Sequence, residues 1–149
     1  MNDALNTTAL NTGALNAVRR IALVYAVVLG LVTLLNYLPG LTDDQGRVFG
    51  IFALDLYDDL LHGASAAWAG VAAWTSTRAC LTYFKVFGSL YLLDGLLGLA
   101  TGSGFLDLAI VVYGVQDLPL QFKVLANGPH IALGGFAVYV GFVLARRHA

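Results

Sequence analysis

Charged residues are scarce in this sequence. Lysine, arginine and acidic residues together make up 11% of the 149 residues, whereas about 25% is typical of soluble domains. Hydrophobic residues make up 58% of the chain, and the mean hydropathy is +0.76. The length corresponds to a single domain, and the composition excludes an ordinary soluble one.

Cysteine and clustered basic residues are also nearly missing. The one cysteine, Cys80, excludes a disulfide framework within the chain and any metal site built from several cysteines. No basic stripe is present, and no segment interleaves basic with aromatic residues. We therefore do not expect a nucleic-acid partner.

Long apolar runs are what the sequence does contain. A transmembrane helix needs about 20 largely apolar residues to cross about 30 Å of hydrocarbon. Four runs approach this length, at 21–38, 60–77, 81–100 and 124–145. They predict an all-α integral membrane protein with four transmembrane helices in a membrane domain at 19–149, with the lipid bilayer as its partner.

A fifth apolar run, at 105–115, has only 11 residues and contains Asp107. At that length, and with a charge inside it, a further crossing is not expected. We interpret this run as an interfacial or re-entrant segment.

The cations are unevenly distributed between the two sides that four crossings define. Six of the eight fall on the side of the two termini: Arg19, Arg20, Arg78, Lys85, Arg146 and Arg147. Because cytoplasmic loops are enriched in lysine and arginine, we predict cytoplasmic termini and outer acidic loops in a bacterial inner membrane. Residues 1–18 are then a cytoplasmic leader, expected to be poorly ordered, with an amphipathic surface helix as the alternative.

The four runs form two similar pairs. An offset of 58 residues aligns the first run with the third, and an offset of 68 aligns the second with the fourth. The aligned pairs include Tyr25 with Tyr83, Gly30 with Gly88, Asn36 with Asp94, Asp59 with Asn127, and His62 with His130. Each repeat has two crossings, so both halves have the same topology. This predicts two repeated helical hairpins related by a pseudo-twofold axis along the membrane normal.

One polar residue from each run falls at the same predicted depth. Counting helical rise from the run ends places Asn36, His62, Asp94 and His130 roughly 5–10 Å below the outer boundary. Polar residues inside a membrane protein face the bundle and find partners. These four residues are the candidate ligand-binding layer, and Asp58, Asp59 and Asn127 beside them are secondary candidates.

Three interpretations of this polar layer remain open. Its members could hydrogen-bond across helices and fix the packing of the bundle. They could instead relay protons or bind a small polar solute that arrives from outside. In the third interpretation, His62 and His130 ligate a haem iron or a divalent metal, because neutral imidazole is a good ligand for either.

The stretches "YDDLLHGASAAWAG" and "NGPHIALGG" carry a resemblance to a known family. They resemble an uncharacterised bacterial family of four-span membrane proteins with an Asn/Asp-x-x-His element at the start of spans 2 and 4. Asp59 and Asn127 would open the two elements here, and His62 and His130 would close them. The resemblance covers roughly 20–145 and implies a four-span fold, but no activity.

No arrangement of catalytic side chains can be argued from this sequence. We therefore expect a non-enzymatic membrane protein, either a structural component or a subunit of a membrane complex, with a homodimer as one possibility. The alternatives are a transport, proton-relay or sensing protein that uses the polar layer, and a redox protein with haem between two histidines.

Overall fold

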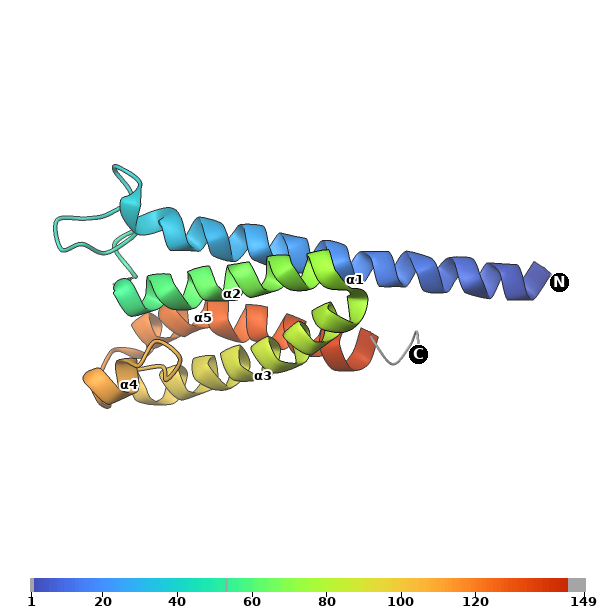
Figure 1. The fold of residues 1–149 in the computed structure, drawn as a ribbon. Coiled ribbons are helices and arrows are strands. Elements are labelled where there is room, and N and C mark those ends of the chain that lie inside the picture. Colours follow the sequence, from blue (N-terminus) through green and yellow to red (C-terminus); the bar gives the residue numbers. More distant parts are fainter. Residues whose placement is uncertain (1, 53, 145–149) are drawn as a thin grey trace.

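The computed structural model describes the backbone of residues 2–52 and 54–144, and side chains from Asn16 onward within those ranges. Four long helices form its body (Figure 1): α1 (Asn2–Leu34), α2 (Leu56–Thr75), α3 (Thr77–Thr101) and α5 (Leu120–Val138). Three short elements complete it: the 3-10 helix η1 (Leu35–Tyr37), α4 (Ala109–Val112), and η2 (Tyr139–Leu144), a π-helical continuation of α5. The described ranges contain no strand, so the predicted all-α class is confirmed.

Two sequence predictions concern the ends of the chain. The backbone of α1 is helical from Asn2 and therefore runs through the predicted leader at 1–18. The poor order expected of this leader stays a prediction. Arg146 and Arg147, which close the fourth apolar run, lie outside the described residues.

Three of the long helices are long and apolar enough to cross a membrane. They are Asn16–Tyr37, Thr77–Thr101 and Leu120–Leu144, with 22, 25 and 25 residues. The remaining predicted span, at 60–77, falls on α2. This helix has 20 residues but is not among these three. Its composition explains the difference, because α2 contains two aspartates, a histidine and many alanines in place of leucine or valine.

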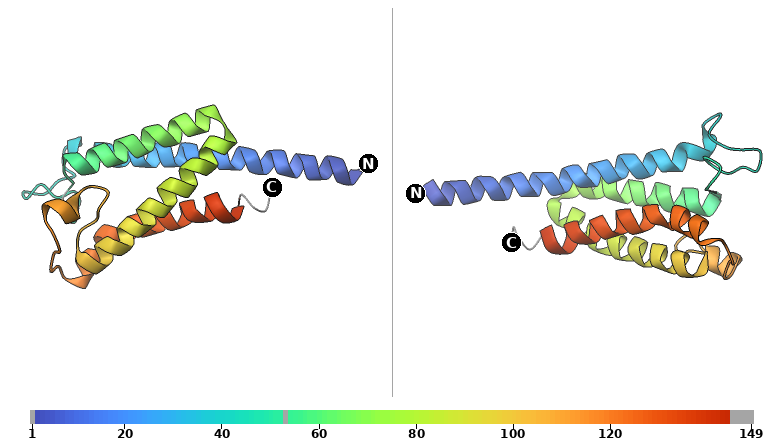
Figure 2. Two further views of the ribbon diagram at one scale, coloured as in Figure 1. Left: turned by 60° about the horizontal axis from the view of Figure 1, so that its bottom comes forward. Right: turned by 180° about the vertical axis from the view of Figure 1, so that it is seen from behind.

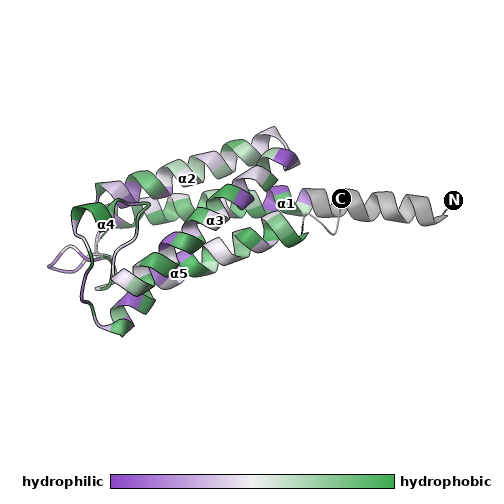
Figure 3. Cartoon of the chain, turned by 90° about the horizontal axis from the view of Figure 1, so that it is seen from below, coloured by the Kyte–Doolittle hydropathy of each residue, from purple (hydrophilic) through white to green (hydrophobic). Residues whose placement is uncertain are grey.

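The polar residues of α2 nevertheless face the interior of the bundle. Asp59, His62 and Ser65 are buried, with exposed fractions of 8% or less. The opposite face of the helix exposes large apolar side chains, including Val71 at 64% and Trp74 at 87%. A helix at the surface of a soluble protein shows the reverse arrangement. Apolar residues also predominate along the neighbouring helices (Figure 3), and some of them are exposed, including Leu31 at 58% and Leu93 at 57%.

The helices pack as two hairpins. α1 lies along α2, and α3 lies along α5 (Figure 2). The second hairpin is especially close, since a Cβ atom added at Gly88 would lie 2.6 Å from the backbone nitrogen of Val138. A Cβ at Gly134 would collide with the backbone of Leu92. Small residues at such positions let membrane helices approach closely.

Aromatic side chains fill the middle of the bundle. Tyr83, Phe87 and Tyr91 on α3 stack in sequence, with ring centroids 4.9 and 4.0 Å apart. Tyr25 of α1 packs edge-on against Tyr83 at 6.3 Å, and its hydroxyl donates a hydrogen bond to the carbonyl oxygen of Leu133 at 2.7 Å. These contacts join the two hairpins, because Tyr25 lies in the first and its partners lie in the second.

Side-chain caps fix where α2 and α3 begin. The Asp55 carboxylate accepts hydrogen bonds from the backbone nitrogens of Tyr57 and Asp58, and Asp58 Oδ2 accepts one from Asp55 N in return. This capping box satisfies amides that the first helical turn leaves free. Ser76 caps α3 through the backbone nitrogen of Ala79, so α3 begins four residues before the predicted start of its span.

The apolar run 105–115 forms part of the loop between α3 and α5 and includes α4. This loop lies at the same end of the bundle as the start of α2 (Figure 1). It does not cross the bundle, and its placement at an interface stays a prediction.

The close approach of α3 and α5 gives a test of the packing. We expect Gly134→Ala to lower the free energy of unfolding by about 1–3 kcal/mol, the usual cost of overpacking. Gly135→Ala is the matched control, because a Cβ added there meets no atom within 4 Å. Thermal unfolding in detergent measures both variants, and equal melting temperatures for the two would contradict the packing described.

Candidate functional site

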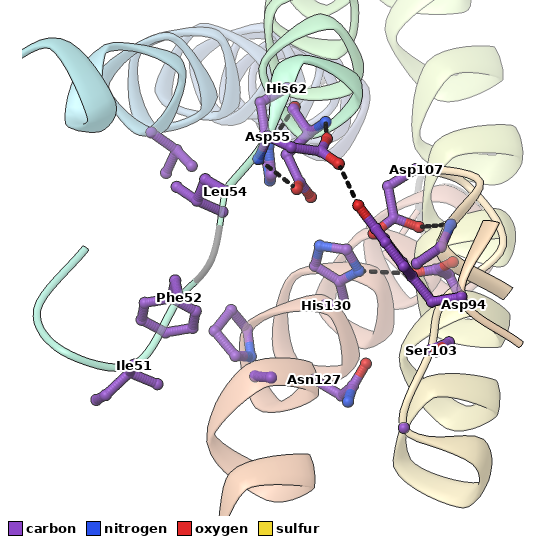
Figure 4. A pocket seen from close by; sticks show the side chains of 18 of the residues that line it. Ile51, Phe52, Leu54, Asp55, His62, Asp94, Ser103, Asp107, Asn127 and His130 are labelled. Carbon is purple, nitrogen blue, oxygen red and sulfur yellow. Dashed lines mark hydrogen bonds and ion pairs between the residues drawn. The ribbon is translucent and has the colours of Figure 1, made fainter. Parts of the chain in front are cut away.

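A cavity of about 600 Å³ opens between the two hairpins, at the end of the bundle where α2 begins. The cavity is lined by residues from α1, η1, the loop between η1 and α2, α2, α3, the loop that contains α4, and α5. Figure 4 shows His62, Asp94 and His130 around this cavity, together with Asp55 and Asp107. The site therefore draws on both hairpins and on the loop that joins α3 to α5.

Asp94 is the most completely bonded polar side chain of the site. It is 1% exposed, and its Oδ1 atom accepts hydrogen bonds from the backbone nitrogens of Phe105 and Leu106 at 2.6 and 2.8 Å. Its Oδ2 atom lies 2.6 Å from His130 Nδ1. The carboxylate thus connects α3 to both the following loop and α5.

Gly104 allows the loop to approach Asp94 this closely. A Cβ atom at Gly104 would lie 2.7 Å from Asp94 Oδ1, inside the contact distance of a carbon and an oxygen. Only a residue without a side chain brings the next two backbone amides onto the carboxylate. Gly104 is thus required by the polar contact of Asp94 with the loop.

Hydrogen bonds fix the orientation of both imidazoles. His62 Nδ1 lies 2.7 Å from the carbonyl oxygen of Asp58, which can only accept, so Nδ1 carries the hydrogen. We assign His130 in the same way, because two amide donors on Asp94 Oδ1 favour the ionised carboxylate, which accepts from His130 Nδ1. In neutral imidazole the Nε2 atoms are then left as acceptors.

Both Nε2 atoms lack a hydrogen-bond partner among the described residues, and both rings line the cavity. The ring centroids of His62 and His130 lie 6.0 Å apart, and Tyr91 packs against His130 at 4.8 Å. His62 is 6% exposed. The site therefore presents two neighbouring acceptors from a mostly buried position.

Carboxylates complete the polar lining. Asp55, Asp58 and Asp107 line the cavity, and the hydroxyl of Tyr113 donates to Asp55 Oδ2 at 3.4 Å. The carboxylate of Asp58 accepts a hydrogen bond from the backbone nitrogen of Asp55 at 3.0 Å. The described lining of the cavity therefore contains several carboxylates and no lysine or arginine.

The remaining sequence-predicted residues lie in other contacts. Asn36 Nδ2 donates to the carbonyl oxygen of Leu54 at 3.0 Å and to the Asp59 carboxylate at 3.3 Å, and the Tyr37 hydroxyl also donates to Asp59. Asn36 and Asp59 do not line the cavity. The structure thus brings together three of the four predicted layer residues, and Asn36 forms a separate contact with Asp59 between η1 and α2.

Asn127 lines the cavity and donates through Nδ2 to the carbonyl oxygen of Lys123. Its amide also packs directly against Gly98, where an added Cβ would collide with it. Sequence reasoning missed Asp107 and Tyr113 as site residues. The one available signal was the charge of Asp107 inside an apolar run, which gives no direction for the side chain.

Metal ligation by His62 and His130 is not supported by further donors. Within residues 16–52 and 54–144, no group of three or more histidine, cysteine or acidic side chains has a geometry that could hold a metal ion. The described part of the protein would therefore supply a metal at this position with only two ligands, the imidazoles of His62 and His130.

Comparisons of the chain with known protein families, with curated proteins and with solved structures found no match. The resemblance of the two Asn/Asp-x-x-His elements to a bacterial four-span family therefore rests on those residues alone.

The bonding of Asp94 predicts a large effect of its removal. Asp94→Ala leaves two backbone amides and the His130 Nδ1–H without an acceptor, and each unsatisfied buried group costs about 1–3 kcal/mol. We expect a loss of about 3 kcal/mol or more in unfolding free energy, with faster amide exchange at Phe105 and Leu106. Asp117→Ala, an exposed carboxylate in the same loop, is the control. A stability equal to that of the control would show that Asp94 does not organise the loop.

Proposed function

We propose that the protein is a non-enzymatic, four-span membrane protein that binds a small polar solute in the cavity between its hairpins. The observation that carries this proposal is the position of His62 and His130, which both line the cavity and whose Nε2 atoms have no hydrogen-bond partner among the described residues. A layer that served only to fix helix packing would use its polar atoms on one another. Solute binding, for sensing or transport, is therefore favoured over a purely structural component.

The distribution of polar and apolar residues on α2 supports a membrane crossing by this helix. A helix that lies against lipid must turn polar side chains inward and apolar ones outward. α2 does this along its length, with His62 and Ser65 inward and Leu60, Val71 and Trp74 outward. Its 20 residues correspond to about 30 Å of helix, enough to cross the hydrocarbon. The low mean hydropathy of α2 then results from the polar side chains on its inner face.

The two ends of the bundle differ in charge, which supports the proposed orientation. At one end, the Arg19 guanidinium donates to the carbonyl oxygens of Ala73 and Trp74 at 2.8 and 3.1 Å. At the opposite end, Asp55 caps the start of α2 beside the acidic cavity. The bias of lysine and arginine toward the cytoplasm then places the termini inside and the cavity at the outer face.

Contacts between repeat-equivalent residues support the pseudo-twofold axis. In a twofold arrangement, a residue touches its own equivalent only on the axis. Tyr25 packs against Tyr83 at 6.3 Å, and His62 packs against His130 at 6.0 Å. These are the pairs aligned by the offsets of 58 and 68 residues. A line through the two contacts runs from the centre of the bundle into the cavity.

The aromatic core favours access to the cavity from outside. Between the cavity and the Arg19 end, the interior is filled by buried side chains of Tyr25, Tyr83, Phe84 and Phe87. A solute that enters from the outer face would stop at the two histidines. This supports binding for sensing, or an outward-facing state of a transporter.

A haem or metal protein is the second candidate, and one observation favours it. Histidines that ligate metals commonly donate their other ring N–H to a carboxylate or a backbone carbonyl. His130 and His62 have those two partners, Asp94 and the carbonyl of Asp58. An absorption spectrum of the purified protein distinguishes this candidate, since haem held by two histidines gives an intense Soret band.

Solute binding predicts a cavity-dependent gain in stability. A ligand that binds only the folded state raises its stability by RT ln(1 + [L]/Kd). We expect at least one class among small amines, amides, carboxylates and sugars, each at millimolar concentration, to raise the melting temperature of the purified protein. Val32→Trp should abolish the gain, because Val32 lines the cavity.

Val27→Trp is the matched control, because Val27 lies on the outward face of the same helix at 61% exposure. It should respond to the solute as the unchanged protein does. If no class raises the melting temperature, or if both tryptophan variants respond alike, the proposed function is wrong.

A further inference from the structure

We infer that the cavity takes a small organic cation with a primary ammonium group, bound between the Nε2 atoms of His62 and His130. This inference rests on the proposed function and specifies its ligand. It follows from three features of the lining: two fixed acceptors, an excess of carboxylates, and an apolar wall.

The acceptors determine the hydrogen-bonding character of the ligand. The Nδ1–H groups of both histidines are already used, by the carbonyl of Asp58 and by Asp94. A neutral imidazole held in this way offers only the Nε2 lone pair to the cavity. A ligand that bridges the two rings must therefore supply N–H or O–H donors, and an ammonium group supplies three N–H donors.

The charge of the lining determines the sign of the ligand. Asp55, Asp58, Asp94 and Asp107 line the cavity, whereas none of the described residues that line it is lysine or arginine. The charge of Asp94 is stabilised by three hydrogen-bond donors, whereas Asp58 and Asp107 have one backbone donor each. An anionic ligand would meet uncompensated repulsion here, and a cation would be attracted.

The apolar wall favours an organic cation over a hydrated inorganic one. Leu29 and Val32 of α1, Phe52 of the first loop, and Leu133 of α5 face the same cavity. Burial of an alkyl group against these side chains adds a favourable contribution that a bare ion cannot obtain. A short alkylammonium combines all three requirements.

Four probes that share a four-carbon chain separate charge from hydrogen bonding. Binding of butylammonium, butyltrimethylammonium, butyramide and butyrate is measured by calorimetry on the full chain in lipid nanodiscs. We expect butylammonium to bind at least about tenfold more tightly than the other three, because it alone combines a positive charge with N–H donors. The trimethyl probe keeps the charge but has no N–H donor.

Two variants test the acceptors without blocking the cavity. His62→Leu removes one acceptor and should weaken butylammonium binding about tenfold. Asp94→Asn places an amide opposite His130 Nδ1 and favours the tautomer in which Nε2 carries the hydrogen, so the second acceptor becomes a donor. Butylammonium should bind Asp94→Asn more weakly to a similar extent. Asp44 is an exposed carboxylate away from the cavity, so Asp44→Asn should leave butylammonium binding unchanged.

Each variant is compared only after its melting temperature shows that it is folded, and Asp107→Asn provides a milder variant if both others unfold. This substitution keeps a side-chain oxygen for the backbone nitrogen of Ala109 but removes a charge, and it should weaken butylammonium binding several-fold.

The outcomes separate the inference from the proposed function. If butyrate or butyramide binds in a His62-dependent manner and butylammonium does not, the cavity binds solutes but the ammonium inference is wrong. If butyltrimethylammonium binds as tightly as butylammonium, the two Nε2 atoms are not acceptors for the ligand and the inference is equally wrong. If no solute class binds at all, the proposed function itself fails.

Discussion

A polar group inside a membrane protein must face the bundle and find partners there, and the half of this structure that contains the cavity is arranged around that constraint. Asp94 is the clearest case, because it is 1% exposed and accepts hydrogen bonds from two loop amides and from His130. Satisfying this carboxylate draws the loop after α3 over the end of the bundle and holds His130 in one orientation. The cavity wall is a consequence of that bonding.

The same constraint explains the unusual composition of α2. Its interior face contains Asp59, His62 and Ser65, and each has a partner: Asn36 and Tyr37 for the first, the carbonyl of Asp58 for the second, and Tyr91 for the third. The helix is less apolar than its neighbours because its polar residues are used inside the bundle. Its apolar residues, such as Val71 and Trp74, remain on the outer face.

The sequence predicts the class, the long helices and part of the site. Alignment of the two halves pairs His62 with His130, whose rings lie 6.0 Å apart in the structure. Counting helical rise gives the depth of a residue but not its direction around the helix. For that reason the sequence predicts Asn36 in one layer with the histidines, whereas its amide donates to Leu54 and Asp59.

Other parts of the site depend on contacts that no local pattern specifies. The loop at 102–119 is shaped by the bond of Asp94 to amides eleven and twelve residues later, so Asp107 and Tyr113 could not be placed from spacing. The mean hydropathy of α2 is lower than that of the spans in the other long helices, because a mean combines the polar inner face of α2 with its apolar outer face. The two faces can be distinguished only when the direction of each side chain is known from the packing.

The account depends most directly on α2 crossing the membrane, since only then does the cavity open at the outer face. Single cysteines at Asp44, Ser76 and Asp117, in a Cys80→Ala background, can be labelled in intact cells with a membrane-impermeant maleimide. The account predicts labelling at positions 44 and 117, and labelling at position 76 only after the cells are permeabilised. Labelling of position 76 in intact cells, together with position 44, would place both ends of α2 on the same side and contradict it.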